Sequence, residues 1–340
     1  MFKKIEIWIL YLVVLLGIPV TIFFGGLVRH ELLGGTRLGR VSKTALFFAS
    51  IPQNFKKALK PIDADLKVED RFPLLDGFNG TPNQSESYLL LSRYDGDLKE
   101  SIVELIDLMN FKVLHTWNPD VDEINKSVKK NDEFKNIHID YKNARAPIFH
   151  PKLTQDGGLL FHYNGDPLKK IDSCSNLIFQ NQHDKFHHSI ETDIEGNIWG
   201  PSYVYPQTLP EEIVGRDFQY EDGSIEDGIL KLSSSGKILF RKSLSKIFIE
   251  NNLKNYLFGY GHYYLKDPLH LNDIQPVDFD SDYWKKGDLF LSLRNQSMIV
   301  LYRPSNNQIV WKIQGPFFNQ HDVDILDATR ISIFNNRMQK

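Results

Sequence analysis

A short unit that recurs along the second half of the chain most constrains the fold. Each copy begins near a histidine, continues into a short apolar run, turns at Gly or Asp and returns in a second run. The copies start at His150, His188, His270 and His321, with 38 positions from the first to the second and 51 from the third to the fourth. Units of this length and pattern are typical of four-stranded propeller blades. The sequence therefore predicts an all-β fold, a β-propeller.

The clearest copy lies between His270 and His321. Its three runs, 288–293, 298–302 and 308–313, are rich in β-branched, Leu and aromatic residues and are separated by turn residues, which predicts an antiparallel meander. The 82 positions from His188 to His270 hold one blade with insertions, or two. An earlier blade is predicted from 88 to 117. We expect six blades, in a ring left incomplete unless the N-terminal region supplies strands, because only 19 residues follow His321.

The repeat also predicts where the histidines meet. A propeller places the first strand of each blade against a central channel, so residues at equivalent positions of successive blades converge there. We therefore expect His150, His188, His270 and His321 to share one pocket, although up to 171 positions separate them in the chain. The sequence leaves open whether His188 or its neighbour His187 faces that pocket.

Residues 7–28 form an apolar segment near the N-terminus. Its 22 residues include Thr21 as the only conventionally polar one, and a helix of this length crosses a hydrocarbon core of about 30 Å. We predict a single-pass membrane helix; a cleaved signal peptide and a buried core helix are the alternatives. Basic residues flank the segment on both sides, so the positive-inside rule leaves the orientation open.

We divide the chain into an anchor at 1–30, a juxtamembrane linker at 31–84 and a propeller domain at 85–340. Within the linker, residues 41–59 have weak helical periodicity and basic side chains, which suits either an ordinary linker helix or one lying on the membrane surface. Residues 118–143 are charged and nearly without pattern, with room for one short helix, and we interpret them as a solvated insertion.

Charge and motifs narrow the classes of partner. A net charge of −3 with intermixed signs gives no nucleic-acid footprint. The single cysteine, Cys174, excludes an intramolecular disulfide. We find no Gly-rich nucleotide motif, zinc-finger spacing or nucleophile elbow, so we expect no cofactor and no bound metal.

Histidines beside an arginine and an asparagine at a channel mouth suit chemistry on an oxyanion. A neutral imidazole can act as a nucleophile or a base, because its unperturbed pKa is about 6.5. The Arg294 guanidinium offers a fork of donors that matches a tetrahedral anion, and Asn272 can donate to further oxygens. This composition favours the transfer of an anionic group.

At these residues the chain resembles the bacterial arylsulfotransferase (ASST) family of propeller proteins. The resemblance covers roughly residues 85–340, and four ordered motifs carry it: Phe186-His187-His188, His270-Leu271-Asn272, Ser292-Leu293-Arg294 with Ser297, and Gln320-His321-Asp322. It implies transfer of a sulfuryl group from an aryl sulfate to a phenolic acceptor without a nucleotide donor. The chain departs from the family in its retained apolar segment and in lacking a cysteine pair.

The resemblance also implies residue roles and a location. His321 would be the nucleophile that is transiently sulfated. His270, Asn272 and Arg294 would bind the sulfuryl oxygens, and His188 would assist proton transfer or bind oxygen. We also expect His187 and His150 to contact the substrate. The propeller would lie in the periplasm, anchored to the inner membrane.

Two other functions remain open from the residues alone. A membrane-anchored propeller can be a non-catalytic platform that binds a ligand or protein partner, and its histidines would then be bonded to backbone carbonyls. Converging histidines could instead hold zinc or copper. No carboxylate or cysteine completes a recognisable metal spacing, however, and Arg294 would repel the cation.

Overall fold

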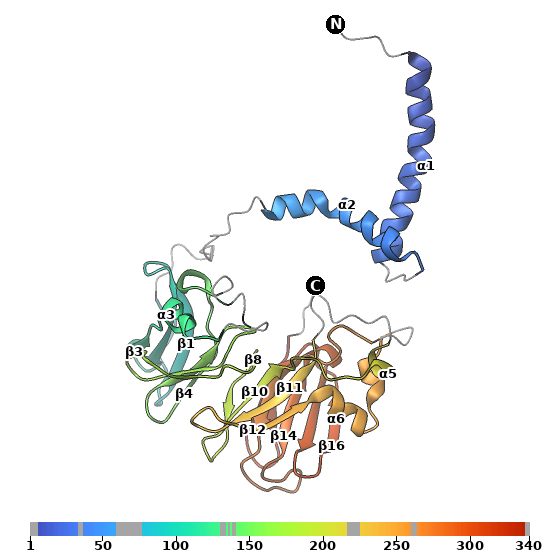
Figure 1. Cartoon of the computed structure of the whole chain (residues 1–340). Helices are drawn as coiled ribbons and strands as arrows, with labels where there is room; N and C mark the ends of the chain where they lie inside the picture. The colour runs from blue at the N-terminus through green and yellow to red at the C-terminus, as the bar shows by residue number, and fades with distance from the viewer. Residues whose placement is uncertain are drawn as a thin grey trace. The chain divides into compact units, whose positions relative to one another are not determined.

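The computed structural model describes residues 6–32, 37–58, 77–129, 134, 137, 141–215, 225–259 and 264–336. The chain divides into two compact units, Met1–Val68 and Glu69–Lys340. Figure 1 shows that the first unit is helical and the second is built mainly of strands.

The helical unit contains α1 (Ile7–Leu32) and α2 (Gly39–Ala58). α1 is long and apolar enough to cross a membrane, and its most apolar stretch is exposed throughout. The two helices are joined by a hydrogen bond of 2.6 Å from Ser42 Oγ to Glu31 Oε2. The helix expected within residues 41–59 is confirmed as α2. Residues 59–76 of the predicted linker lie outside the described residues.

In the described part of the β unit, five antiparallel sheets follow one another along the chain. The first contains β1 (Tyr88–Asp95), β2 (Glu100–Asp107) and β3 (Lys112–Trp117). The second contains β4 (Phe149–Leu153), β5 (Leu159–His162), β6 (Lys169–Ile171) and β7 (Leu177–Gln180). The third contains β8 (Lys185–Phe186), β9 (Glu191–Thr192), β10 (Ile198–Tyr203), β11 (Asp227–Leu232) and β12 (Ile238–Ser243). The fourth contains β13 (Leu271–Pro276), β14 (Leu289–Leu293), β15 (Met298–Arg303) and β16 (Gln308–Gln314), and the fifth β17 (His321–Ile325) and β18 (Ile331–Phe334).

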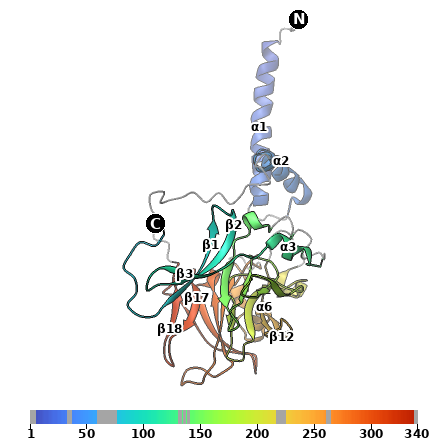
Figure 2. The same cartoon turned by 90° about the vertical axis from the view of Figure 1, so that its left-hand side faces the viewer.

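The sheets are propeller blades. In the second and fourth sheets, sequential strands pair in the order β4-β5-β6-β7 and β13-β14-β15-β16. Strands at one edge of neighbouring sheets contact one another, β1 with β4, β9 with β13, and β13 with β17. Figure 2 turns the molecule so that the sheet of β1, β2 and β3 faces the viewer. The predicted all-β propeller class is confirmed, since up-and-down sheets whose edge strands meet define it.

Short helices fill the connections between the strands. They are α3 (Val121–Lys126), α5 (Glu211–Val214), α6 (Leu244–Glu250), η1 (Asn143–Arg145), η2 (Lys254–Leu257) and η3 (Arg294–Gln296). Because α5, α6 and η2 occupy the loops on either side of β11 and β12, the stretch from His188 to His270 is one blade with insertions. The described residues therefore hold five blades where six were expected, and the last has two strands.

The predicted meander of the fourth blade is confirmed almost residue for residue. Every residue of β14 is buried, as a near-continuous apolar strand should be when both faces of its sheet are covered. The core on one side packs Ile247 and Phe248 of α6 against Leu289 and Leu291 of β14. Each such fully buried side chain stabilises the fold by roughly 1.5–3 kcal/mol.

The interpretation of residues 118–143 as a solvated insertion is wrong for part of this stretch. Val121, Ile124 and Val128 are buried, and so are Phe134 and Ile137. Val121 and Ile124 lie on α3, which packs against the first and second blades. The apolar residues are spaced at a helical period among charged ones, so the buried face forms only when the helix does.

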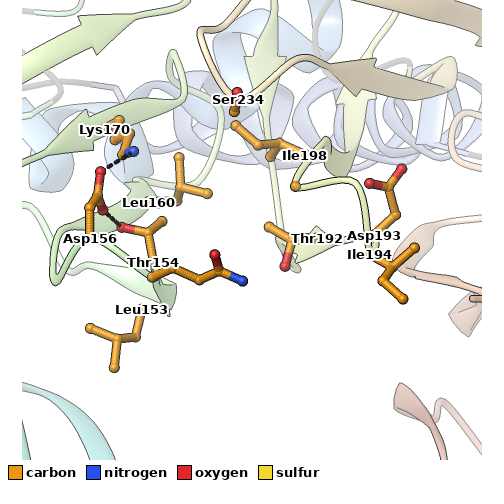
Figure 3. A pocket seen from close by; sticks show the side chains of 12 residues that line it. Leu153, Thr154, Asp156, Leu160, Lys170, Thr192, Asp193, Ile194, Ile198 and Ser234 are labelled. Carbon is orange, nitrogen blue, oxygen red and sulfur yellow. Dashed lines mark hydrogen bonds and ion pairs between the residues drawn. The ribbon is translucent and has the colours of Figure 1, made fainter.

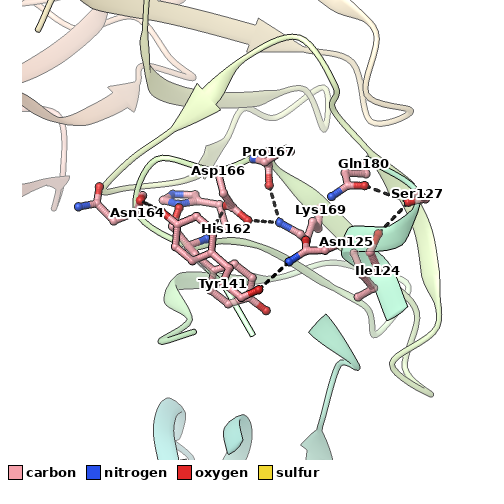
Figure 4. Close-up of polar contacts among 11 residues, drawn as sticks. Ile124, Asn125, Ser127, Tyr141, His162, Asn164, Asp166, Pro167, Lys169 and Gln180 are labelled. Atoms are coloured by element: carbon pink, nitrogen blue, oxygen red, sulfur yellow. Dashed lines mark hydrogen bonds and ion pairs between the residues drawn. The ribbon is translucent and has the colours of Figure 1, made fainter. Parts of the chain in front are cut away.

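A buried ion pair lies in the second blade, next to the third. Lys169 and Asp166 are both fully buried, and Lys169 Nζ donates to the Asp166 carboxylate and, at 3.0 Å, to Pro167 O (Figure 4). The ammonium also lies 4.8 Å from the centroid of the Tyr163 ring. Burial raises the pKa of Asp166 to about 6, with Lys169 opposing the shift. The same group of residues holds His162, whose ring Nε2 lies 3.1 Å from His188 O.

Candidate active site

The repeat histidines share an unusual backbone conformation. His150, His188 and His270 have φ of 40°, 59° and 55°, in the left-handed region. For a residue with a side chain this region costs roughly 1–2 kcal/mol, and such residues cluster at functional sites. His150 is the second residue of β4, His188 lies between β8 and β9, and His270 directly precedes β13. In the fifth blade the left-handed residue is Asp322, with φ of 58°, directly after His321.

Three of these histidines meet in one cluster. The ring centroids of His188 and His270 are 5.0 Å apart, and those of His188 and His321 are 5.8 Å apart. The three rings come from the third, fourth and fifth blades, so only the arrangement of blades brings them together. His150 is exposed, and it is close enough that its charge contributes to lowering the pKa of His321.

His188 lies at the centre of the cluster and is held neutral. Burial lowers the pKa of His188 to about 2, and the neighbouring His187, His270 and His321 reinforce the shift, because each disfavours a second positive charge. Its Nδ1 lies 2.9 Å from Nδ1 of His187. That contact leaves Nε2 of His188 for the pocket.

His187 packs behind its neighbour. Its side chain is buried, its ring stacks on Tyr203 at 4.3 Å between centroids, and its Nε2 lies 3.3 Å from Asp227 Oδ1. His188 is therefore the member of the pair that joins the histidine cluster. The predicted substrate contact through His187 remains a prediction, and this geometry gives both nitrogens of its ring other neighbours.

His270 has a carboxylate behind it. Its Nδ1 lies 2.5 Å from Asp267 Oδ2, and both side chains are about a quarter exposed or less. An imidazole in this arrangement presents an N–H to the carboxylate, which fixes the orientation of the ring. We did not select Asp267 from the sequence, although an aspartate three residues before a repeat histidine was a usable signal.

His321 has an amide behind it. Its Nδ1 lies 2.8 Å from Nδ2 of Asn336, which follows β18. The oxygen and nitrogen of a side-chain amide are assigned from the hydrogen-bond network, so either end of Asn336 can face the ring. Burial lowers the pKa of His321, and the positive charge of Arg294 adds to the shift. The ring is consequently neutral at neutral pH.

Arg294 begins η3, directly after β14. Its backbone N–H donates to His270 O at 3.0 Å, which ties the arginine to the histidine cluster. Its Nη1 donates to Asn295 Oδ1 at 3.0 Å. Within the part of the chain that the structure describes, no carboxylate forms an ion pair with this guanidinium. A cation with donors to spare therefore lies near His321.

Asn272 is buried and holds the segment that precedes His321. Its Nδ2 donates to Gln320 O at 2.7 Å. Gln320, which is fully buried, donates through Nε2 to Ser292 Oγ at 3.1 Å and Met298 O at 3.0 Å. The predicted contact of Asn272 with sulfuryl oxygens remains a prediction; in this structure its amide positions the backbone beside His321.

Carboxyl groups lie further along the same inner strands. Asp273 on β13 is buried, and burial raises its pKa to about 7, although the Ser189 hydroxyl and the Val323 N–H favour the charged form. Burial also raises the pKa of Glu191 on β9, whose Oε2 lies 2.6 Å from Lys152 Nζ. Among the residues described, no group of three or more His, Cys, Asp or Glu has the arrangement of a metal site.

A cavity of about 410 Å³ lies elsewhere, between turns of the second and third blades (Figure 3). Its charged groups are paired, Lys170 with Asp156 at 2.7 Å and Lys231 with Asp193 at 2.9 Å. Leu153 and Thr192, which line it, end β4 and β9, whereas the repeat histidines precede or begin these strands. The cavity is thus at the other end of the inner strands from the histidine cluster.

The blades and the histidine cluster define a β-propeller protein with a candidate active site where the inner strands begin. Residues 150–340 match the family model described as Arylsulfotransferase (ASST). The chain therefore belongs to the arylsulfotransferase family. A comparison with curated proteins gives no match.

Solved structures with a similar arrangement include three bacterial proteins. A protein of unknown function from Bacteroides caccae is 12% identical, with 68% of this chain and 60% of that chain covered and a TM-score of 0.40. Hydrazine synthase from Kuenenia stuttgartiensis is 10% identical, with coverages of 75% and 70% and a TM-score of 0.40. BamB from Moraxella catarrhalis is 10% identical, with coverages of 73% and 51% and a TM-score of 0.35. The chain spans less than two thirds of the first of these proteins.

Proposed function

We propose that this protein transfers a sulfuryl group from an aryl sulfate to a phenolic acceptor through a sulfohistidine at His321, without a nucleotide donor. The observation that carries the proposal is the meeting of His188, His270 and His321 from three blades beside the Arg294 cation. Membership of the arylsulfotransferase family supports the class of reaction.

The proposed nucleophile is Nε2 of His321. Burial and Arg294 keep the ring neutral, and Nδ1 is engaged by Asn336, so Nε2 is the nitrogen left for the substrate. With the amide oxygen of Asn336 facing an Nδ1–H, Nε2 keeps its lone pair. Attack forms the Nε2–S bond and breaks the bond between sulfur and the aryl oxygen, which leaves as a phenol after taking a proton.

Positive groups around the sulfuryl oxygens would stabilise the charge that shifts during the transfer. Arg294 supplies a guanidinium without a carboxylate partner among the described residues, and His270, held in place by Asp267, is the proposed second contact. Asn272 retains a second amide hydrogen and completes the proposed set of donors. Donors already in place in this way contribute several kcal/mol to the transfer step.

The second half-reaction would return the sulfuryl group to a phenol. The acceptor oxygen attacks the sulfur of the sulfohistidine, the Nε2–S bond breaks and the acceptor loses its proton to the site. His188 is the proposed residue for this proton, and His150 and His187 stay proposed as further substrate contacts. Two half-reactions through one covalent intermediate give ping-pong kinetics.

The non-catalytic platform predicts histidines that are bonded to backbone carbonyls. His162 has that environment, since its two ring nitrogens lie 2.9 Å from Tyr163 O and 3.1 Å from His188 O. His188, His270 and His321 differ, because each has a side chain at Nδ1, although the backbone carbonyl of Asn319 also favours the charged form of His321. This difference favours chemistry at the cluster over a purely structural role.

The test is the intact mass of the full-length protein, purified in detergent, after brief exposure to a chromogenic aryl sulfate without acceptor. We expect an added mass of one sulfuryl group in the wild type and in His183→Ala, an exposed histidine of the third blade, and none in His321→Ala. Absence of an adduct, with no phenol released with or without a phenolic acceptor, would favour the binding platform.

We also propose that the predicted anchor at 1–30 holds the protein in the inner membrane with the 85–340 domain in the periplasm and 31–84 as the linker. The support is α1, which is long and apolar enough to span. Alkaline phosphatase fused after the last residue should be active and a fluorescent protein fused there dark, because the first folds only outside the cytoplasm. The reverse result would place the propeller in the cytoplasm.

A further inference from the structure

His187 and Asp227 lie one behind the other, both buried, behind His188; His187 Nε2 is at ion-pair distance from Asp227 and makes no hydrogen bond among the described residues. His187 Nδ1 lies 2.9 Å from His188 Nδ1, and His187 Nε2 lies 3.3 Å from Asp227 Oδ1. The side chain of His187 is 2% exposed and that of Asp227 is 5% exposed. Asp227 is itself held in place, because its Oδ2 accepts the Leu271 N–H at 2.7 Å.

The groups that face His187 come from four elements. Asp227 belongs to β11 and is the carboxylate among them, and Tyr203 of β10 stacks on the ring. His188 follows in the chain, and His162 of β5 is near enough to interact with His187 electrostatically. Of these neighbours, Asp227 is the one with a negative charge, and the stacked face of Tyr203 also favours a positive charge on His187.

The transfer reaction poses a problem for His188. A group in the pocket must give a proton to the departing aryl oxygen and take one from the acceptor phenol. Burial and three neighbouring histidines lower the pKa of His188 to about 2, so a positive charge on this ring is strongly disfavoured. Another group must carry the charge if His188 is to pass the proton.

We propose that Asp227, His187 and His188 form a proton relay in which His187, rather than His188, stores the proton of the transfer. The inference rests on the proposed function. His187 is here a positioning and proton-storing residue that acts through His188.

The relay has two states that differ by one proton. In the first, both rings are neutral: His187 has its proton on Nε2, the nitrogen that lies 3.3 Å from Asp227 Oδ1, His188 Nδ1–H donates to His187 Nδ1, and His188 Nε2 has a lone pair. When the acceptor phenol gives its proton to His188 Nε2, the Nδ1 proton of His188 passes to His187 Nδ1. The second state thus has an imidazolium at His187 beside a carboxylate, and His188 stays neutral with an Nε2–H.

The cycle balances over the two half-reactions. In the first, His188 Nε2–H gives its proton to the departing aryl oxygen, and His187 returns one to His188 Nδ1. In the second half-reaction, the acceptor phenol gives a proton to His188 Nε2, and the His188 Nδ1 proton passes back to His187. The charge therefore moves away from His270 and His321 and toward Asp227, which lowers the cost of carrying it in a buried site.

A direct test measures the protonation of His187 by nitrogen NMR of the full-length, 15N-histidine-labelled protein in detergent. His187→Phe, whose ring can still stack on Tyr203, identifies the signal. As the pH is lowered, we expect His187 to become an imidazolium before His188 does, and Asp227→Asn to move that event down by about one pH unit or more. The control is Glu195→Gln, an exposed carboxylate of the same blade, which should change nothing. Protonation of His188 first, or a His187 titration that Asp227→Asn leaves in place, would overturn the relay.

A second readout uses aryl sulfates whose leaving phenols differ in pKa. Asp227→Asn and His187→Phe should slow turnover of phenyl sulfate, a poor leaving group, by about a hundredfold. They should hardly affect 4-nitrophenyl sulfate, whose phenolate needs no proton. Equal slowing of both substrates would show a structural role and reject the relay. A wild type without turnover, in which His187 still protonates first, would reject sulfuryl transfer and leave the buried proton site standing.

Discussion

The histidine cluster and the cavity at the other end of the inner strands contrast in size and in charge. The cavity measures about 410 Å³, yet Lys170 and Asp156 within it neutralise each other at 2.7 Å. The histidine cluster instead has rings that burial keeps neutral, beside a guanidinium that forms no ion pair with a carboxylate among the described residues. We therefore base the proposed site on its unpaired donors and perturbed rings, and not on volume.

The largest expected effect comes from comparing a variant of the histidine cluster with a variant of the cavity. His321→Ala should reduce transfer between phenols by at least about 10⁴-fold, because the nucleophile is lost. Lys170→Ala, which opens the cavity, should leave turnover within about twofold of the wild type. Steady-state assays with a chromogenic donor and a phenolic acceptor measure both. Comparable losses in the two variants would mean that the cavity contributes to the reaction.

Arg294→Gln should lower kcat by about 10²–10³-fold, because a cation aimed at the sulfuryl oxygens is removed. Arg294 also lowers the pKa of His321, so its removal raises that pKa. Since the neutral ring is lost as the pH falls through its pKa, the acid limb of the pH profile should move to higher pH. Arg330→Gln, an exposed arginine of the fifth blade, is the matched control. An unmoved acid limb would argue against contact between Arg294 and the nucleophile.

Asn272→Ala should destabilise the protein by roughly 1–3 kcal/mol, because the buried Gln320 carbonyl loses its donor. The same loosening beside His321 should lower kcat more than it changes KM. Urea unfolding and steady-state kinetics measure the two effects, with the exposed Asn306→Ala as control. A loss of stability with unchanged kcat would show that the segment before His321 tolerates the loss of this bond.

The last effect concerns stability alone and Asp273, further along β13. Burial raises its pKa to about 7 in the folded protein, from an ordinary value of 3.8. The folded state therefore keeps a proton that the unfolded chain releases between these values, so stability from this group is present below pH 3.8 and lost as the pH rises through 7. Asp273→Asn should make the midpoint of urea unfolding depend less on pH between 4 and 8. The exposed Asp97→Asn should not, and equal slopes in all three proteins would contradict the shift.

Local pattern was enough to predict much of the fold. The runs at 288–293, 298–302 and 308–313 correspond to β14, β15 and β16, because period and turn residues are local properties of a chain. Residues 118–143 show the limit of such reasoning. Their charge hid Val121 and Ile124, which become buried only when α3 packs on neighbouring blades.

The candidate site, too, could be predicted only in part from the sequence. The repeat predicted that His150, His188, His270 and His321 converge, since propeller symmetry carries equivalent positions to one channel. The rings of the last three do meet, and His150 is exposed nearby. The groups at their Nδ1 atoms escaped prediction. Asp267 is close in sequence to its histidine, but Asn336 reaches His321 from another strand, and no local signal marks such a partner.

By itself, the sequence determined a propeller, an apolar N-terminal helix and the histidines that would meet. These follow from side-chain periodicity and repetition, which need no knowledge of distant contacts. The tertiary structure decided that His188 joins the cluster while His187 turns toward Asp227, and which side chain backs each ring. The physical reason is that the protonation of a ring depends on its burial and on charges a few ångströms away. Only the packed blades set those distances.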